Sequence, residues 1–214
     1  MGTFYGPVFA GVDAQGHQLF NKYTVTRDAA GHETSRVLAG TTTSPGGDDK
    51  VILGNANPTH TLGVHSQTNW NKFDFSFLVN SAVGQKVFNN TALVYATKSN
   101  ALQDKNFLAS ALTDQIGIKE PAIFSSRYIE NGSFVRLANV TVGYSFNMPG
   151  FMGTNMKTAR VSLSGDNLWL STPYTGYDPE VYTDASLNGL ASRGTDYLHY
   201  PKPRTITGGL RVTF

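Results

Sequence analysis

Apolar and polar residues alternate most regularly at the end of this chain. Every second residue from Ile206 to Phe214 is apolar, apart from Gly208, and the residues between them are threonine, glycine or Arg211. Successive side chains of a β-strand point to opposite faces. The pattern therefore predicts a strand with one apolar face, ending in an aromatic residue, and one polar face carrying an arginine.

A second alternating stretch, residues 59–80, predicts a long β-hairpin. Alternate residues from His60 to Trp70 share one face, and the phenylalanines from Phe73 to Phe77 continue it after a tight turn at Asn71-Lys72. Each arm has roughly the 9–11 residues that a tilted strand needs to cross a bilayer. The length fits a membrane strand as well as a soluble one.

Two further strands are expected, which brings the total to about five long antiparallel strands. Residues 133–146 alternate in their second half, and the break around Arg136 and Leu137 predicts a β-bulge. Residues 159–169 alternate after a turn at 147–157. Short connections (71–72, 147–158) alternate with long ones (82–132, 171–204), which is typical of the periplasmic turns and extracellular loops of transmembrane barrels.

Five strands cannot close a barrel, whose smallest usual size is about eight strands. The expected fold is therefore all-β: part of an incomplete transmembrane β-barrel, with long extracellular loops and a short loop helix within 100–113. Residues 1–58 are expected to form an extracellular meander of short strands (4–12, 17–26 and 34–38), and residues 59–214 the barrel strands with their loops.

Composition narrows the function. A net charge of +2 without any basic run argues against a nucleic-acid partner. The absence of cysteine excludes disulfides, thiolate metal sites and a cysteine nucleophile. No apolar run approaches the roughly 18–20 residues of a spanning helix. Strands of a membrane barrel need no such run, because only every second residue faces lipid. The first residues lack the pattern of a secretory signal, so we expect either a cytoplasmic protein or a piece of a longer exported one.

Aromatic residues cluster where the predicted strands would leave a membrane. A periplasmic-side girdle is expected from Trp70, Phe73, Phe75, Tyr144, Phe146 and Phe214. Arginine on a lipid-facing surface costs roughly 2–4 kcal/mol at the bilayer centre. We therefore expect Asn139, Thr141 and Arg211 to face the barrel lumen. In a soluble protein the same aromatic residues would instead form the core of a β-sandwich.

Several motifs, in order, resemble the C-terminal part of the SusC/RagA family of TonB-dependent outer-membrane transporters. The most recognisable is the run SRYIENGSFVRLANVTVGY at 126–144. The others are GNANP (54–58), VFNNT (87–91), SGDNL (164–168), YTGYDPEV (174–181) and the final stretch 200–214. The resemblance covers roughly residues 54–214 and extends more weakly to the start.

The resemblance implies that these strands belong to a barrel of roughly 22 strands, filled by a plug, that imports glycans or peptides across the bacterial outer membrane. It implies as partners the rest of the barrel and plug, a SusD-like lipoprotein lid, the TonB–ExbB–ExbD complex, outer-membrane lipid, and the barrel-assembly machinery through Phe214. Sequences matching the plug and the TonB box are missing, so the chain is not expected to transport alone. The run Gly46–Lys50 is too short for an EF-hand loop.

Candidate contact residues for a substrate or the lid are Tyr174, Tyr177, Asp178 and Glu180. The alternative is that they shape and pack their loop. No catalytic residue, cofactor or metal site is expected: G-x-S-x-G is absent, and His60 and His65 lie on opposite strand faces. The competing hypothesis is a soluble carbohydrate-binding β-sandwich, in which the apolar face of the sheet is covered.

Overall fold

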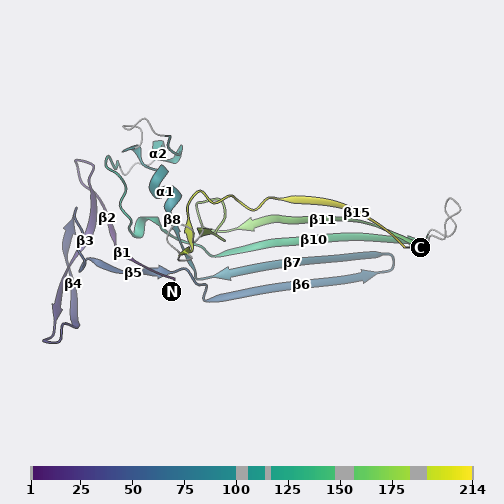
Figure 1. Cartoon of the computed structure of the whole chain (residues 1–214), viewed down its shortest axis with the longest axis horizontal. Helices are drawn as coiled ribbons and strands as arrows, with labels where there is room; N and C mark the ends of the chain where they lie inside the picture. Colours follow the sequence, from purple (N-terminus) through teal and green to yellow (C-terminus); the bar gives the residue numbers. More distant parts are fainter. Residues whose placement is uncertain (1, 100–105, 114–116, 148–156, 184–191, 214) are drawn as a thin grey trace. The chain divides into compact units, whose positions relative to one another are not determined.

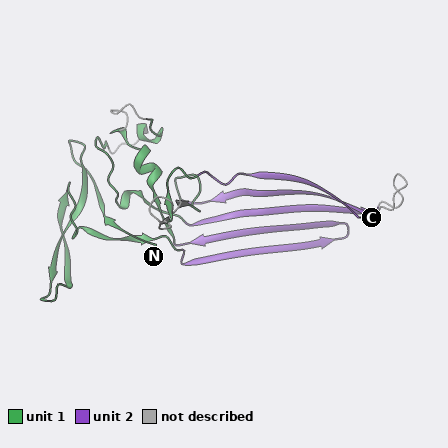
Figure 2. Ribbon diagram, viewed as in Figure 1, with its two compact units in different colours: residues 1–57, 85–132, 174–199 green, residues 58–84, 133–173, 200–214 purple. Residues whose placement is uncertain are grey.

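The computed structural model describes residues 2–99, 106–113, 117–147, 157–183 and 192–213. The chain divides into two compact units (Figure 2). Unit 1 comprises residues 1–57, 85–132 and 174–199, and unit 2 comprises residues 58–84, 133–173 and 200–214. Both consist mainly of β-strands, which confirms the predicted all-β class.

Unit 2 is one antiparallel sheet with the strand order β15-β11-β10-β7-β6 (Figure 1). Its strands are β6 (His60–Trp70), β7 (Phe73–Val83), β10 (Phe134–Asn147), β11 (Thr158–Ser171) and β15 (Thr205–Thr213). The five predicted long strands are therefore confirmed. Among the described residues nothing pairs with the outer edges of β6 and β15, so the sheet is open.

The β6–β7 hairpin has the predicted two-residue turn. Trp70 pairs with Phe73, and Asn71 between them has a φ of 56°. Asparagine tolerates this left-handed conformation better than most residues, because its short polar side chain can bond locally. The turn fixes the register, and with it the face on which each residue of both strands lies.

The predicted bulge is also present. The pairing of β10 with both β7 and β11 shifts between Leu137 and Asn139. On β11 the shift is accommodated at Asn167, whose φ is 53°. The Asn167 side chain accepts a hydrogen bond from Arg136 and donates one of 2.7 Å to the carbonyl of Lys202. The SGDNL motif thus ties the bulge to the segment that leads into β15.

Unit 1 contains several small sheets. The first two pair β1 (Thr3–Pro7) with β5 (Lys50–Asn55), and β3 (Gln18–Arg27) with both β2 (Phe9–Val12) and β4 (Glu33–Thr42). Strands β3 and β4 correspond to the strands expected at 17–26 and 34–38, the single strand expected over 4–12 is divided into β1 and β2, and β5 was not predicted. The other two sheets have the strand orders β14-β8-β9 and β12-β13. Their strands are β8 (Lys86–Asn89), β9 (Ile129–Asn131), β12 (Tyr182–Thr183), β13 (Ser192–Arg193) and β14 (Thr195–Asp196).

The helices are short. Helix α1 (Asn90–Tyr95) begins after Asn89, whose side chain accepts a hydrogen bond from the backbone of Ala92 and so caps it. The sequence did not predict this helix. Helix α2 (Ser110–Thr113) lies in the stretch where a loop helix was expected, of which residues 100–105 fall outside the described part. Among the described residues, no helix has the length and apolar character needed to cross a membrane.

Candidate functional site

The apolar face of the unit 2 sheet is the most unusual surface of the molecule. Cross-strand register places Phe75, Val142 and Leu163 side by side on this face. Leu163 is 60% exposed and Leu210 on β15 is 71% exposed. A water-soluble sandwich would cover such residues with a second sheet. Their exposure contradicts the soluble β-sandwich hypothesis.

Five of the six predicted girdle residues gather near the β6–β7 turn on this apolar face. Trp70 lies opposite Phe73, which lies opposite Tyr144. The ring centroids of Phe73 and Tyr144 are 4.7 Å apart, and Tyr144 stacks on Phe146 with centroids 6.1 Å apart. Phe75 follows Phe73 on the same face, one row further from the turn. The sixth residue, Phe214, lies outside the described residues.

A further aromatic residue lies toward the opposite end of the same face. Trp169 pairs with Leu137, which pairs with Val79, and its side chain is largely exposed. The bulge between Leu137 and Asn139 interrupts the alternation that leads to it along the sequence. The apolar surface between Tyr144 and Trp169 is thus bounded by aromatic residues at both ends, as membrane barrels are.

The opposite face of the sheet is polar and carries an ion pair. The guanidinium of Arg160 on β11 reaches across β10 to the carboxylate of Asp74 on β7, with Nε 2.9 Å from Oδ1. Between them lies Gly143, where a Cβ atom would overlap both side chains. A glycine inside a strand often marks such a close approach. The ion pair therefore explains why β10 has glycine at this position.

The three residues predicted to face the lumen share this polar face. Asn139 donates a hydrogen bond of 2.7 Å to Asp166, and Thr141 donates one of 3.3 Å to Asn139. Arg211 lies on β15 directly opposite Arg160. Together these side chains form a polar surface across three neighbouring strands.

In unit 1, a buried polar network joins segments that are far apart in the sequence. The hydroxyl of Tyr174 donates to Asp196, which also accepts hydrogen bonds from Thr91 and the backbone of His199. Tyr174 is only 5% exposed, and burial together with the Asp196 bond raises its pKa well above the usual range. Glu130 accepts bonds from Asn89 and from both the backbone and the side chain of Thr175.

The four predicted contact residues have different surroundings. Tyr174 and Asp178 are buried, and Asp178 accepts a 2.9 Å hydrogen bond from the backbone of Glu180, two residues ahead. Glu180 is half-buried. Tyr177 is 76% exposed. Of the four, Tyr177 presents the most surface to a partner or ligand, whereas Tyr174 and Asp178 hold the loop in shape.

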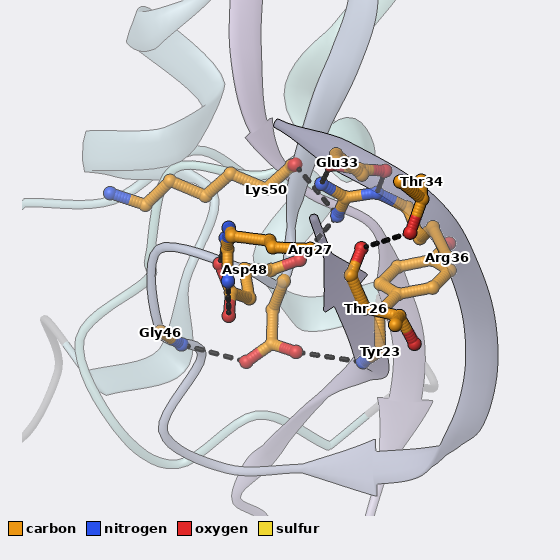
Figure 3. Close-up of polar contacts among 10 residues, drawn as sticks. Tyr23, Thr26, Arg27, Glu33, Thr34, Arg36, Gly46, Asp48 and Lys50 are labelled. Atoms are coloured by element: carbon orange, nitrogen blue, oxygen red, sulfur yellow. Dashed lines mark hydrogen bonds and ion pairs between the residues drawn. The ribbon is translucent and has the colours of Figure 1, made fainter. Parts of the chain in front are cut away.

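The β3–β4 hairpin of unit 1 carries a second polar cluster (Figure 3). Arg27 pairs with Asp48, and Arg36 pairs with Glu33 and also donates to the Asp48 carbonyl. The buried carboxylate of Asp49 accepts 2.8 Å hydrogen bonds from the backbone amides of Tyr23 and Gly46. The GGDDK loop is thus fastened to the hairpin by these side chains.

Asp49→Ala is expected to loosen this loop. Two backbone amides would lose their acceptor, and because both bonds are only partly buried we expect the loss of about 0.5–1.5 kcal/mol that is typical of one hydrogen bond. The amides of Tyr23 and Gly46 should exchange with deuterium correspondingly faster, whereas Asp48→Asn, which changes an exposed carboxylate, should leave them nearly unchanged. Equal exchange rates in both variants would contradict the assigned role of Asp49.

Acid is expected to weaken the same hairpin. The hydrogen bond from Arg27 lowers the pKa of Asp48, and that from Arg36 lowers the pKa of Glu33. A carboxyl group with a lowered folded-state pKa stabilises the fold above its unfolded pKa of about 4, and this stabilisation is lost as the pH falls further. Hydrogen exchange near the hairpin tip, corrected for its intrinsic pH dependence, should accelerate below about pH 4. In a variant with both Asp48→Asn and Glu33→Gln, this acceleration should disappear.

Within the described residues, no group of three or more His, Asp or Glu side chains is placed to hold a metal ion. His60 and His65 lie on opposite faces of β6, as its register with β7 requires. The described surfaces of unit 2 are an apolar face with aromatic ends and a polar face, and unit 1 adds structured loops.

Comparison with known proteins places these features among bacterial receptors, although no protein-family model matches. The chain is 32% identical to TonB-dependent receptor P3 of Formosa agariphila, over all of this chain and 22% of that protein. It is 30% identical to TonB-dependent receptor SusC of Bacteroides thetaiotaomicron, over 72% of this chain and 15% of that protein. The chain thus spans about a fifth of the length of these relatives.

Solved structures show the same fold. The RagAB peptide importer in its closed-closed state matches 99% of this chain and 23% of that chain, with a TM-score of 0.72 and 24% identity. The open-open state also gives a TM-score of 0.72, at 23% identity. The open sheet and its loops therefore have a counterpart within a much larger chain.

Proposed function

Because this chain belongs to the TonB-dependent receptors of the SusC/RagA type and matches a C-terminal barrel portion of them, we propose that it supplies five membrane-spanning strands and their loops to a nutrient import channel of the bacterial outer membrane. The uncovered apolar face of a sheet with two open edges carries this proposal. Lipid covers the face, and other strands of the same barrel pair with the edges.

The size of the apolar face is compatible with this assignment. Val161 pairs with Tyr144, so the aromatic-bounded surface runs along β11 from Val161 to Trp169. The same two rows are six residues apart on β7, from Phe73 to Val79; at about 3.3 Å per residue this is roughly 20 Å, or about 15 Å along the membrane normal for a strand tilted by about 40°. An outward apolar band in outer-membrane barrels is about 25 Å tall.

The proposed orientation follows from the connections. The tight β6–β7 turn faces the periplasm, and the long segments 85–132 and 174–199 and residues 1–58 belong to the extracellular side. The polar face, with Asn139, Thr141 and Arg211, lines the lumen. This arrangement puts the apolar face of each strand against lipid, and the described residues of that face carry no charged side chain.

The proposed cargo is a peptide or a glycan, and a SusD-like lipoprotein closes the extracellular side. The solved relatives are peptide importers, which supports the peptide class. Tyr177 is the proposed contact residue for cargo or lid, with Glu180 beside it. Energy comes from TonB–ExbB–ExbD, Phe214 is read by the barrel-assembly machinery, and the chain itself performs no catalysis.

The test uses the complete receptor in its outer membrane. This chain contributes no cysteine, so in a receptor whose remaining part has been freed of cysteine a spin label can be attached to a single new cysteine at Leu163→Cys or, as the matched control, at Ser164→Cys. The label at 163 should collide mainly with lipid-dissolved oxygen, and the label at 164 with a water-soluble nickel complex or with protein. A label at 163 that collides mainly with the nickel complex would refute the membrane assignment.

A further inference from the structure

Unit 2 is unusually poor in negative charge. Its sequence contains two acidic residues, Asp74 and Asp166, against seven lysines and arginines. Asp74 is paired with Arg160, and Asp166 accepts a hydrogen bond from Asn139. Both carboxylates on the polar face are therefore already engaged.

Arg211 is a further cation on this polar face. Among the described residues it makes no ion pair, hydrogen bond or ring contact, and its side chain is exposed. It lies directly opposite Arg160, and like charges facing each other across strands destabilise a sheet. Asp166 is six residues along β11 from Arg160, about 20 Å away at 3.3 Å per residue, too far to compensate.

The surface beside Arg211 is open. The neighbouring row on the polar face consists of Ser162 on β11 and Gly209 on β15. A Cβ atom at Gly209 would crowd the Ser162 hydroxyl. Neither residue of this row therefore has a side chain that projects far above the sheet. Glycine in a strand interior often marks a place where another backbone approaches closely. A polypeptide in the lumen that packs on the polar face can therefore reach the guanidinium of Arg211.

We propose that Arg211 docks a carboxylate, aspartate or glutamate, of the plug polypeptide that fills the barrel lumen. The proposal rests on the import channel proposed above, because large barrels of this class have a plugged lumen. A carboxylate there would neutralise Arg211 and relieve its repulsion with Arg160. Because the side chains of Ser162 and Gly209 are small, a polypeptide lying on the polar face can approach Arg211 closely. This favours the plug as the partner over the strand that pairs with the edge of β15.

The test places a photo-crosslinking residue at position 211 of the complete receptor in outer membranes and maps the products by mass spectrometry. The expected product joins position 211 to a plug peptide containing Asp or Glu. Products that join it only to a barrel strand or to lipid would overturn the proposal. If the receptor gives a heat-modifiable barrel band in the outer membrane, the import-channel assignment stands whichever crosslink is found. If the wild-type receptor is absent from the outer membrane, both the import-channel assignment and the Arg211 proposal are overturned.

Charge exchange provides a second readout. Arg211→Glu should speed proteolytic release of the plug about tenfold or more, since a charged hydrogen bond is lost. Arg211→Lys should keep most of the plug's resistance to proteolytic release. Arg211→Glu combined with arginine in place of the crosslinked carboxylate should restore that resistance. Thr205→Glu, on the same face of β15 but at its other end, is the control. Equal release in Arg211→Glu and Thr205→Glu would refute the docking role.

Discussion

Val140→Arg is expected to remove most of the folded receptor from the outer membrane. Val140 lies on the apolar face between Phe77 and Gly165, two rows from the aromatic residue Tyr144 and thus near the middle of the proposed apolar band. Arginine at the bilayer centre of a barrel costs about 2–4 kcal/mol. That cost lowers the folded-to-unfolded ratio at least about 30-fold, since each 1.36 kcal/mol is a factor of ten.

Thr141→Arg is the matched control for this experiment. Thr141 is the next residue of β10, on the polar face between Ser76 and Ser164. An arginine there would enter the lumen and keep its hydration or find a polar partner, so folded receptor should be near the wild-type amount. Heat-modifiable mobility of the membrane fraction measures both variants. If Thr141→Arg were the more damaging substitution, the assignment of lipid and lumen faces would be reversed.

Tyr174→Phe is expected to destabilise the small sheets and loops of unit 1. The substitution keeps the ring but removes the hydroxyl that donates to the buried carboxylate of Asp196. The carboxylate would lose one of its donors, at a cost of about 1–3 kcal/mol. Hydrogen exchange of β8, β9 and β14, which the network joins, should accelerate by the corresponding factor.

The same motif provides the control for Tyr174. Tyr177→Phe removes a hydroxyl from a side chain that is 76% exposed, and such surface changes usually alter stability by less than about 0.5 kcal/mol. If Tyr177 is a contact residue, Tyr177→Ala should instead weaken cargo or lid binding at unchanged stability. A stability loss in Tyr177→Phe equal to that in Tyr174→Phe would contradict this division between a packing and a contact tyrosine.

The network also shows why the loops resisted interpretation from sequence. Tyr174 and Asp196 are 22 residues apart, and Glu130 bonds to Thr175 across 45 residues. Strand β8 has four residues, too few for alternation to be recognised. A YTGYDPEV motif looks the same whether its first tyrosine is buried or exposed, because burial depends on segments that the motif does not contain.

The five strands, their two-sided character, the tight turn at Asn71 and the bulge near Leu137 were determined by the sequence alone. Each depends on the order of neighbouring side chains along an extended chain, which is a local property. Tertiary structure alone decided that Arg160 reaches Asp74 over Gly143, and that within the described part of the chain the apolar face has no cover and Arg211 has no partner. These facts depend on which residues meet across strands and on what surrounds them, and no pattern within a single strand contains that information.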